Sequence, residues 1–287
     1  MNILLIGSGG RENAIAKALH ESEGSKKIFC TPGNPGIENY AESLILNTSN
    51  HNEVLNYCDN NNINLVIIGP EVPLVEGLAD FLTQYDILVF GPKMLSAKLE
   101  GSKKFTKEIC EKYKIPTAKF KSFNEEMLAI EYLKKQKFPI VIKADGLAAG
   151  KGVIIAENLD EGIDAVQKNF SGAFSDAGKE IIIEEFMIGE EVSFFVLADE
   201  NSYVELTSAQ DHKRIGLNDT GPNTGGMGAY SPAPIMTNEL KKETIERIIE
   251  PTLRAMKDLN CPYTGVLYAG LMITDEGPKL IEYNVRF

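Results

Sequence analysis

Short apolar runs alternate with helix-like stretches over the first hundred residues of the chain. The runs lie at 3–6, 27–31, 65–68 and 87–90, and each is followed by a turn and a helix candidate. Runs that are almost continuously apolar are typical of strands buried on both faces of a parallel sheet. The pattern therefore predicts an α/β domain at 1–101 with a doubly wound parallel sheet, whose ligands bind at the carboxyl ends of the strands.

From about residue 102 the pattern changes to that of an α+β domain, which we place at 102–287. A lysine-rich helix at 102–113 ends before Pro116, and short strands and helices follow around a glycine-rich loop. The expected strands are 119–122, 140–143, 153–156, 181–184, 191–198, 204–207, 265–274 and 279–285, the expected helices are 125–135, 159–169 and about 238–259, and 211–230 is expected to be a long polar loop.

The charge balance limits the ligands that the chain can hold. With 41 acidic and 29 basic residues, the formal net charge is −12. A general nucleic-acid binder carries the opposite balance, so we expect no nucleic-acid partner. Anionic ligands must instead be held by local clusters of Lys, Arg and glycine-rich turns. The chain has no apolar run of about 18 residues and begins without a basic leader, so we expect neither a membrane span nor a signal peptide.

The cysteines and histidines are scattered along the sequence. The cysteines are Cys30, Cys58, Cys110 and Cys261, and they form no paired motif. Scattered thiols favour a reducing, cytoplasmic compartment over a disulfide framework, and small buried side chains over metal ligands. The three histidines are equally dispersed, and we expect no zinc site.

Glycine-rich turns follow three of the predicted strands. They are GSGGRE at 7–12, PGNPG at 32–36 and GPE at 69–71. Glycines there let backbone N–H groups approach an anion at the start of a helix. A dinucleotide site is disfavoured, because Glu12 occupies the third small position of the fingerprint and no acidic residue ends the second strand. A phosphate-bearing sugar fits better, and a tight turn without a ligand is the alternative.

The strongest local signal is the segment IKADGLAAGKGV at 142–153. It has strand–loop–strand character, but it is not a Walker A loop, because Gly152 stands where Ser or Thr is required. A hairpin flap that lowers backbone N–H groups onto a triphosphate accounts for it. Lys143, at the end of the first strand, can hold a phosphate oxygen as a point charge. A plain glycine hairpin is the alternative.

Two acidic segments complete the pattern. The segment IEEFMIGEEVS at 183–193 offers backbone groups for adenine and a carboxylate for ribose, unless its acidic residues are simply solvated. In the segment LIEYNVR at 280–286, Glu282, Asn284 and Arg286 share one face of a strand. Glu282 and Asn284 carry the hard oxygen ligands that suit Mg²⁺, which bridges nucleotide phosphates. A polar face of an exposed edge strand is the alternative.

In order and spacing these elements resemble the ATP-grasp superfamily, in which two α+β lobes hold ATP between them. Segments 7–12, 69–71, 99–103, 143–152 and 211–232 are similar, more narrowly, to glycinamide ribonucleotide synthetases, and this likeness covers essentially the whole chain. The resemblance implies an N-terminal doubly wound parallel sheet (pre-ATP-grasp) and a two-lobed α+β ATP-grasp domain, with the small lobe at about 117–188.

The resemblance also implies a reaction. The carboxylate of glycine would attack the γ-phosphate of ATP, and the amine of 5-phosphoribosylamine would displace phosphate from the resulting glycyl phosphate. The protein would position the reactants and neutralise charge, with Mg²⁺ or Mn²⁺ as the metal. We expect small-molecule substrates as the partners, no membrane partner, and a monomer or weak dimer.

The resemblance assigns roles to individual residues. ATP would be bound by Lys103, Lys143, Gly146, Gly150, Lys151, Gly152, Glu184, Glu185, Phe186, Met187 and Glu191. The metal ligands would be Glu282 and Asn284, and the catalytic residues Arg286, Lys213 and Asp211. The substrates would be bound by Gly9, Gly10, Arg11, Gly69, Pro70, Glu71, Arg214, Asn223, Gly225 and Gly226.

The sequence departs from the family pattern at two places. Asn13 stands where the family usually has His. Family members also continue beyond the position of Phe287 into a further C-terminal domain, so we expect that domain to be absent and the family fold to be present through residue 287. The alternatives are an ATP-binding fragment without turnover of its own, an ATP-grasp ligase for another carboxylate and amine, and a nicotinamide-dependent oxidoreductase.

Overall fold

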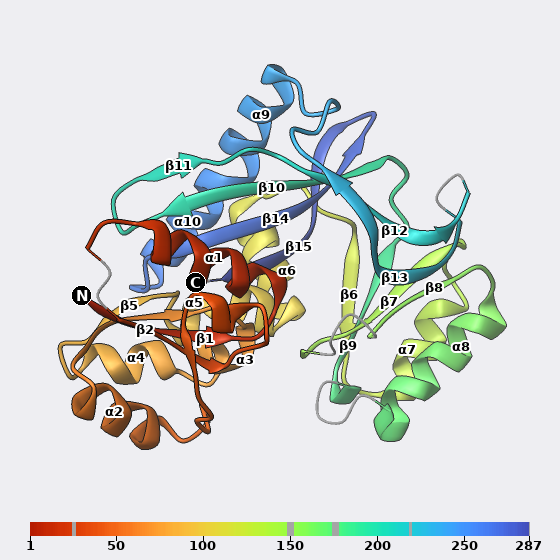
Figure 1. The fold of residues 1–287 in the computed structure, drawn as a ribbon. Coiled ribbons are helices and arrows are strands. Elements are labelled where there is room, and N and C mark those ends of the chain that lie inside the picture. The colour runs from red at the N-terminus through yellow and green to blue at the C-terminus, as the bar shows by residue number, and fades with distance from the viewer. Residues whose placement is uncertain (25–26, 148–151, 174–177, 218–219, 287) are drawn as a thin grey trace.

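The computed structural model describes residues 1–24, 27–147, 152–173, 178–217 and 220–286 of the 287-residue chain. Over these residues the strands form four sheets (Figure 1). One sheet belongs to the N-terminal domain, one to a small lobe and one to a large lobe, and the fourth is a two-stranded hairpin.

The N-terminal sheet is parallel and has the strand order β3-β2-β1-β4-β5. Its strands are β1 (Asn2–Gly7), β2 (Lys27–Pro32), β3 (Glu42–Ser43), β4 (Ile63–Ile68) and β5 (Leu88–Phe90). Its helices are α1 (Gly10–Glu21), the 3₁₀ turn η1 (Ile37–Asn39), α2 (His51–Asn60), α3 (Glu71–Val75), α4 (Leu78–Thr83) and α5 (Met94–Gly101). The predicted doubly wound sheet is confirmed, and its strand order reverses between β1 and β4, where ligands bind in such sheets.

The apolar run in β1 shows why this sheet is covered on both faces. Leu4 and Ile6 belong to one hydrophobic cluster, whereas Ile3 and Leu5 belong to another. Since successive side chains of a strand point to opposite faces, a continuous apolar run needs an apolar layer on each side.

The small lobe is an antiparallel sheet in the order β6-β9-β7-β8 with two helices on one face (Figure 1). Its strands are β6 (Phe120–Phe123), β7 (Ile140–Ala144), β8 (Val153–Ala156) and β9 (Ile181–Glu185), and its helices are α7 (Glu126–Leu133) and α8 (Leu159–Lys168), with a π-helical turn η2 (Asn169–Ala173). Ile140, Ile142, Ile181 and Ile183 pack into a core that this lobe has to itself. The opposite face of the sheet is therefore the one that carries polar groups.

The large lobe is an antiparallel sheet in the order β11-β10-β14-β15. Its strands are β10 (Glu190–Ala198), β11 (Tyr203–Glu205), β14 (Gly265–Thr274) and β15 (Gly277–Arg286), and its helices are α9 (Asn238–Thr244), the π-helical η4 (Ile245–Ile249) and α10 (Glu250–Asp258). The predicted helix at about 238–259 is thus confirmed as one helical run. In the described ranges, no helix is long and apolar enough to span a bilayer.

The prediction of a long polar loop at 211–230 is wrong. These residues form an antiparallel hairpin of β12 (Gln210–Gly216) and β13 (Thr220–Tyr230), in which Asp211 pairs with Ala229 and His212 with Gly228. The segment lacks the alternation of apolar and polar side chains that marks a strand, because its many glycines contribute no side chain. Pairing here rests on backbone hydrogen bonds, and the register shifts twice.

The N-terminal domain and the large lobe share one hydrophobic cluster, which runs from Leu4 to Val285. The helix α6 (Lys103–Tyr113) follows α5, and Ser102 is both the C-cap of α5 and the N-cap of α6. The Ser96 hydroxyl on α5 donates to the carbonyl of Cys261 at 2.9 Å. The small lobe, with its separate core, is therefore the unit that is packed least continuously against the rest.

Candidate active site

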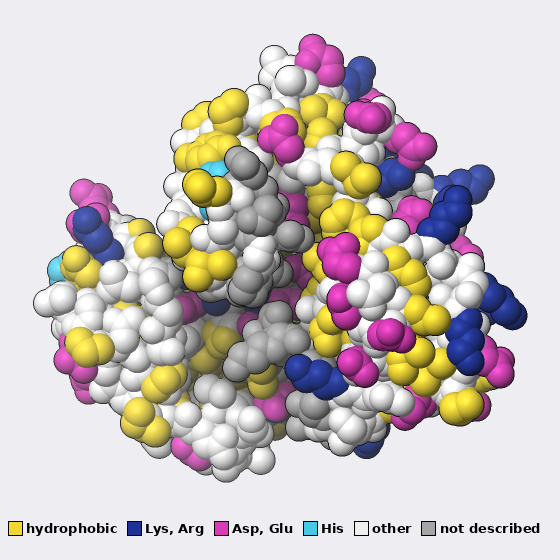
Figure 2. Space-filling model, turned by 90° about the vertical axis from the view of Figure 1, so that its right-hand side faces the viewer, with side chains coloured by type: hydrophobic (Ala, Val, Ile, Leu, Met, Phe, Trp, Pro, Cys, Tyr) yellow, Lys and Arg dark blue, Asp and Glu magenta, His cyan; other side chains and the backbone are white. Residues whose placement is uncertain are grey.

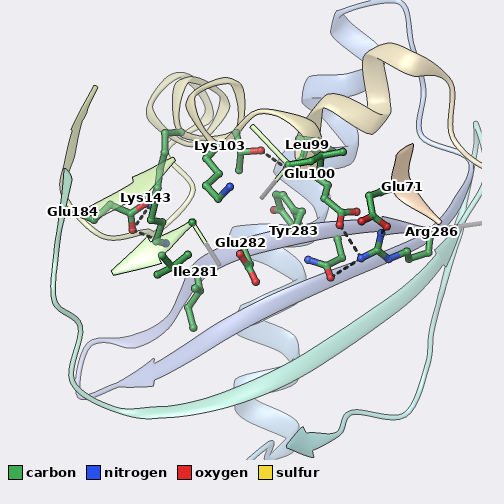
Figure 3. Close-up of a pocket in the computed structure, with 16 residues that line it drawn as sticks. Glu71, Leu99, Glu100, Lys103, Lys143, Glu184, Ile281, Glu282, Tyr283 and Arg286 are labelled. Atoms are coloured by element: carbon green, nitrogen blue, oxygen red, sulfur yellow. Dashed lines mark hydrogen bonds and ion pairs between the residues drawn. The ribbon is translucent and has the colours of Figure 1, made fainter. Parts of the chain in front are cut away.

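A pocket of about 250 Å³ lies where α6, the small-lobe sheet and β15 meet (Figure 3). The predicted residues that line it are Glu71, Lys103, Lys143, Gly152, Glu184, Glu282, Asn284 and Arg286. Lys143 and Glu184 lie at one end, Arg286 lies at the other with Glu71 and Glu100, and Lys103 and Glu282 lie between them (Figure 3). Tertiary structure thus brings part of the predicted nucleotide site, both predicted metal ligands and the predicted catalytic Arg286 into one space.

The small-lobe end of the pocket is built on the polar face of the sheet. In the antiparallel pair β7–β9, Lys143 is opposite Ile182 and Glu184 is opposite Val141, so the two charged side chains are diagonal neighbours on one face. Lys143 Nζ lies 3.0 Å from Glu184 Oε2. The other carboxylate oxygen, Oε1, is buried without a hydrogen-bond partner, so it can accept an N–H group from a bound molecule.

A second lysine, which the sequence analysis missed, also reaches this carboxylate. Lys107 Nζ lies 3.2 Å from Glu184 Oε2. Burial alone raises the pKa of Glu184, but Lys143 and Lys107 outweigh it and hold that pKa below its usual value. Burial in turn lowers the pKa of Lys107. The sequence did contain a signal for Lys107, namely its spacing from Lys103. Residues four apart on a helix share a face, so a helix that places Lys103 in the site also places Lys107 near it.

The middle of the pocket is formed by the start of α6 and the base of the predicted flap. Lys103 Nζ donates to the carbonyl of Gly146 at 3.1 Å. Burial lowers the pKa of Lys103, against the opposing effect of Glu282. The N–H of Lys104 donates to Asp145 Oδ1 at 2.6 Å, which ties the flap base to the helix. The predicted flap residues Gly150 and Lys151 lie outside the described residues.

At the other end, β15 presents the predicted polar face. Tyr283 and Val285 are buried, whereas Glu282, Asn284 and Arg286 are partly exposed and line the pocket. The shared face predicted from the sequence is confirmed. Figure 3 shows Glu282 directed into the pocket, away from the group around Arg286.

The donor set on β15 fits a divalent cation that is shared with a ligand. Glu282 and Asn284 supply one carboxylate and one amide oxygen, and Mg²⁺ is typically held by one or two carboxylates together with substrate phosphates and water. Among the described residues, no group of three or more His, Cys, Asp or Glu side chains forms an all-protein metal cage. One carboxylate and one amide oxygen would leave positions around such a cation for phosphate oxygens and water.

Arg286 is held by two carboxylates and one amide. Its Nη1 lies 2.5 Å from Glu71 Oε2, its Nη2 lies 2.7 Å from Glu100 Oε1, and Nη2 also donates to Asn284 Oδ1 at 3.1 Å. Burial raises the pKa of Glu100 to about 7, although Arg286 opposes this. Glu100 lies in a segment that carried the family resemblance, but no role was predicted for it.

A second pocket, of about 390 Å³, lies at the carboxyl ends of β1 and β2 and includes the predicted residues Gly9, Arg11 and Pro70. Its floor is Glu12, which is 3% exposed. Glu12 Oε2 accepts from the N–H of Gly9 at 2.7 Å, and Oε1 accepts from Arg11 Nε at 2.7 Å. Arg11 Nη2 also donates to the carbonyl of Gly69 at 2.8 Å. Glu12 thus organises the turn for which a phosphate-bearing sugar was predicted, and it occupies the position that disfavoured a dinucleotide there.

Glycines are required around Glu12 because its side chain fills the space that a Cβ would occupy. A Cβ on Gly7 would lie 2.5 Å from Glu12 Cγ, and one on Gly69 would lie 2.1 Å from Glu12 Oε1. By contrast, nothing lies within 4 Å of a Cβ on Gly10, the first residue of α1. The glycines of two separate turns are therefore explained by one buried carboxylate.

The remaining predicted residues lie in the connection between the lobes and in the hairpin. Glu185 ends β9 and accepts from the N–H of Lys119 at 3.0 Å, Phe186 and Met187 follow it, and Glu191 is exposed on β10. Asp211 lies in β12 and Gly226 in β13. For Lys213, Arg214, Asn223 and Gly225 the structure describes only the backbone. None of these residues, as far as they are described, lines the pocket between the lobes.

Acidic and basic side chains are distributed unevenly over the face of the molecule drawn in Figure 2. Figure 2 shows acidic side chains spread over one face of the molecule, with Lys and Arg gathered mainly along one edge. The pocket between the lobes is lined by four basic side chains and four carboxylates, so its formal charge is balanced, whereas the chain as a whole has a net charge of −12.

A parallel N-terminal sheet followed by two α+β lobes, with lysines and carboxylates lining the pocket between them, defines the ATP-grasp class of protein. Comparison with known families narrows this class. Residues 1–100 match the model described as Phosphoribosylglycinamide synthetase, N domain, and residues 101–287 match the model described as Phosphoribosylglycinamide synthetase, ATP-grasp (A) domain. The chain belongs to the phosphoribosylglycinamide synthetase family.

Individual relatives agree with this assignment. The chain is 54% identical over 287 residues to the phosphoribosylamine–glycine ligase of Rhizobium meliloti (strain 1021), covering 100% of this chain and 68% of the relative. It is 48% identical over 291 residues to that of Escherichia coli (strain K12), covering 100% and 68%. The crystal structure of the phosphoribosylamine–glycine ligase from Thermotoga maritima superposes with a TM-score of 0.84 at 33% identity, covering 100% of this chain and 69% of that one.

Proposed function

We propose that this chain catalyses the ATP-dependent ligation of glycine to 5-phosphoribosylamine, which yields glycinamide ribonucleotide, ADP and phosphate in purine biosynthesis. The observation that carries the proposal is the meeting of Lys103, Lys143, Glu282, Asn284 and Arg286 in one pocket. The names of the relatives, which match the chain over its whole length, support the choice of substrates.

The reaction divides into two displacements. In the first, a carboxylate oxygen of glycine forms a bond to the γ-phosphorus of ATP, the bond from that phosphorus to the β–γ bridging oxygen breaks, and ADP leaves with the bonding electrons. In the second, the amine nitrogen forms a bond to the carbonyl carbon of glycyl phosphate. Phosphate leaves with the electrons of the C–O bond, and the amine loses a proton.

The residues of the pocket would serve this chemistry by placing charge. Lys103 and Lys143 would hold phosphate oxygens, and Arg286 would lie beside the phosphoryl group in transfer, where fixed positive charge stabilises the transition state. Glu282 and Asn284 would hold Mg²⁺ or Mn²⁺. When bound, the divalent cation supplies further neutralisation of the phosphate oxygens.

The two pockets meet at one dipeptide, which suggests where the substrates lie. Pro70 lines the N-terminal pocket and Glu71 lines the pocket between the lobes. The phosphate of 5-phosphoribosylamine would be held at 7–11, and its amine would reach past Glu71 toward the acyl phosphate. Asp211, Lys213, Arg214, Asn223, Gly225 and Gly226 on the hairpin would close over glycine.

The nucleoside would lie at the connection between the lobes. Backbone groups from Glu184 to Met187 would meet adenine, Glu191 would hold the ribose, and the unpartnered Oε1 of Glu184 offers an acceptor for an amino group. We also propose a cytoplasmic location and a monomer or weak dimer. The four cysteines are all buried and free, which is typical of a reducing compartment.

The experiment that tests the proposal is an assay of ADP release from Mg·ATP in the presence of glycine and 5-phosphoribosylamine, with the amide product identified by mass. The reaction lacking each substrate in turn is the control. The proposal predicts product only in the complete mixture. Binding of Mg·ATP without product would favour an ATP-binding fragment, and the assay would then be repeated with a chain extended past Phe287. ADP release with another carboxylate would favour a different ligase.

A further inference from the structure

Three charged side chains share one buried site at the small-lobe end of the pocket. The ammonium groups of Lys107 and Lys143 lie 3.2 Å and 3.0 Å from the same oxygen of Glu184. The side chains of Lys107, Lys143 and Glu184 are 3%, 6% and 2% exposed. With two ammonium groups and one carboxylate, the cluster has one more positive than negative charge, although a single counter-ion would suffice to neutralise Glu184.

The two lysines differ in how they are anchored. Lys107, from α6, donates to Thr117 Oγ1 at 2.6 Å, and that hydroxyl donates in turn to the carbonyl of Leu280 at 2.7 Å. Its ammonium group also lies 5.6 Å from the centre of the Phe120 ring. Lys107 also lines the pocket, but these contacts give its ammonium group a second anchor besides Glu184.

Lys143 is placed differently, at the end of β7 where the glycine-rich segment begins. It pairs with Val153 across the strands, and the N–H of the next residue, Ala144, donates to the carbonyl of Gly152 at 2.8 Å. Figure 3 shows its side chain at the end of the pocket, in contact with Glu184. Lys107 Nζ has a hydrogen bond to Thr117 in addition to its ion pair with Glu184, whereas the ion-pair partner of Lys143 Nζ among the described residues is Glu184. A phosphate group in the pocket would therefore draw Lys143 away from Glu184 more readily than Lys107.

We propose that Lys107 is a positioning residue that keeps Glu184 neutralised, so that Lys143 can move from Glu184 to a nucleotide phosphate. This inference rests on the proposed function, because it assumes that the pocket takes Mg·ATP. Its physical basis is that a buried carboxylate without a cation is strongly disfavoured. With Lys107 in place, Glu184 retains one cation when Lys143 leaves. Without Lys107, the movement of Lys143 to the phosphate would leave the buried Glu184 carboxylate without a neighbouring cation.

The first variant is Lys107→Met, which keeps the long apolar stem and removes the charge. Glu184 then has Lys143 as its remaining cation in the cluster, and the dissociation constant of Mg·ATP is expected to rise at least about tenfold, since disturbing a buried charge pair changes binding by this much or more. Lys112→Met is the matched control. Lys112 lies on the same helix but is exposed, so its loss removes the same charge without touching the cluster.

The second variant tests whether Lys107 acts through Glu184, or instead by contact with the nucleotide or by packing. In the double variant K107M/E184Q, the neutral amide needs no counter-ion, so Lys143 is again available to phosphate. We expect this protein to bind Mg·ATP more tightly than K107M and within about threefold of E184Q alone, which is non-additivity of the kind that coupled residues give. If methionine is not tolerated in the fold, Lys107→Gln, whose amide can still donate to Thr117, replaces it in both proteins.

Binding is measured by calorimetry on the whole chain, after thermal unfolding has shown that each variant is folded at the temperature used. Affinity in K107M equal to that of the unmodified chain would overturn the inference. A double variant that binds no better than K107M would also overturn it, because Lys107 would then act by contact with the nucleotide or by packing alone. If the unmodified chain itself binds no Mg·ATP, the proposed function fails as well, so the two failures are distinct.

Discussion

Arg286 of β15 and Glu71 of α3 form an ion pair across 215 residues of sequence, with 2.5 Å between Nη1 and Oε2. The pair joins the large lobe to the N-terminal domain at the point where the two pockets meet. Glu100 completes the arrangement from the other side, at 2.7 Å from Nη2. The arginine that we place beside the phosphoryl group is therefore oriented by the domain that we propose to hold the sugar phosphate.

Replacing Arg286 by Lys tests this orientation. Lysine keeps the charge but lacks the planar fork that contacts Glu71 and Glu100 together. We expect Arg286→Lys to lower the rate of product formation about 100-fold, the scale of losing one fixed donor to a transition state. The dissociation constant of Mg·ATP should change less than about threefold. A rate close to that of the unmodified chain would contradict the role of Arg286 in phosphoryl transfer.

Glu100 predicts a dependence of stability on pH. Burial raises its pKa from the usual 4.5 to about 7, so in that range the folded chain binds more protons at this site than the unfolded chain. The contribution of Glu100 to the free energy of unfolding is fully present below about pH 4.5. It is lost as the pH rises toward 7, at up to about 1.4 kcal/mol per pH unit.

The variant Glu100→Gln isolates this contribution. In urea unfolding without metal, the stability of the variant relative to the unmodified chain should improve between about pH 5 and pH 7. Glu276→Gln is the control, because Glu276 is exposed and its hydrogen bond to Lys279 lowers the pKa of its carboxylate, so that this group stays ionised over the range tested. A stability difference between E100Q and the unmodified chain that stays constant over this range would show that burial does not perturb Glu100.

Gly69→Ala should destabilise the N-terminal domain. The new methyl group would lie 2.1 Å from Glu12 Oε1, and the carboxylate is held in place by Gly9 and Arg11. Relief of such overlap typically costs about 1–3 kcal/mol, measured as the free energy of unfolding in urea. Gly10→Ala is the matched control, since a methyl group there meets nothing within 4 Å. Equal effects of the two substitutions would argue against the crowding at Glu12.

The oxygen ligands on β15 predict how the chain depends on divalent metal. Glu282→Gln and Asn284→Ala should each raise the Mg²⁺ concentration needed for half-maximal ADP release, by at least about tenfold. Glu276→Gln, on the turn that precedes β15, should leave it unchanged. Its carboxylate pairs with Lys279 at 2.6 Å and is 78% exposed. If the ligand variants follow the same Mg²⁺ titration as the control, the metal is held elsewhere.

Much of the architecture was accessible from the sequence because its signals are local. The apolar run at 3–6 predicted a strand buried on both faces, and β1 divides its side chains between two clusters. The period of two in the last strand predicted that Glu282, Asn284 and Arg286 share a face, as they do in β15. The hairpin at 211–230 was missed, since glycines carry no side chains from which a period can be read.

The sequence by itself determined most of the helices and strands, the order of the lobes and the kinds of charged group that the site would use. Tertiary structure alone decided the partners of those groups. Glu12 accepts a hydrogen bond from the turn at Gly9, Glu184 is the shared counter-ion of Lys107 and Lys143, and Arg286 pairs with Glu71 of another domain. The physical reason is range: strand and turn patterns depend on neighbours along the chain, whereas a buried charge is stabilised by whichever opposite charge the completed fold places within about 4 Å.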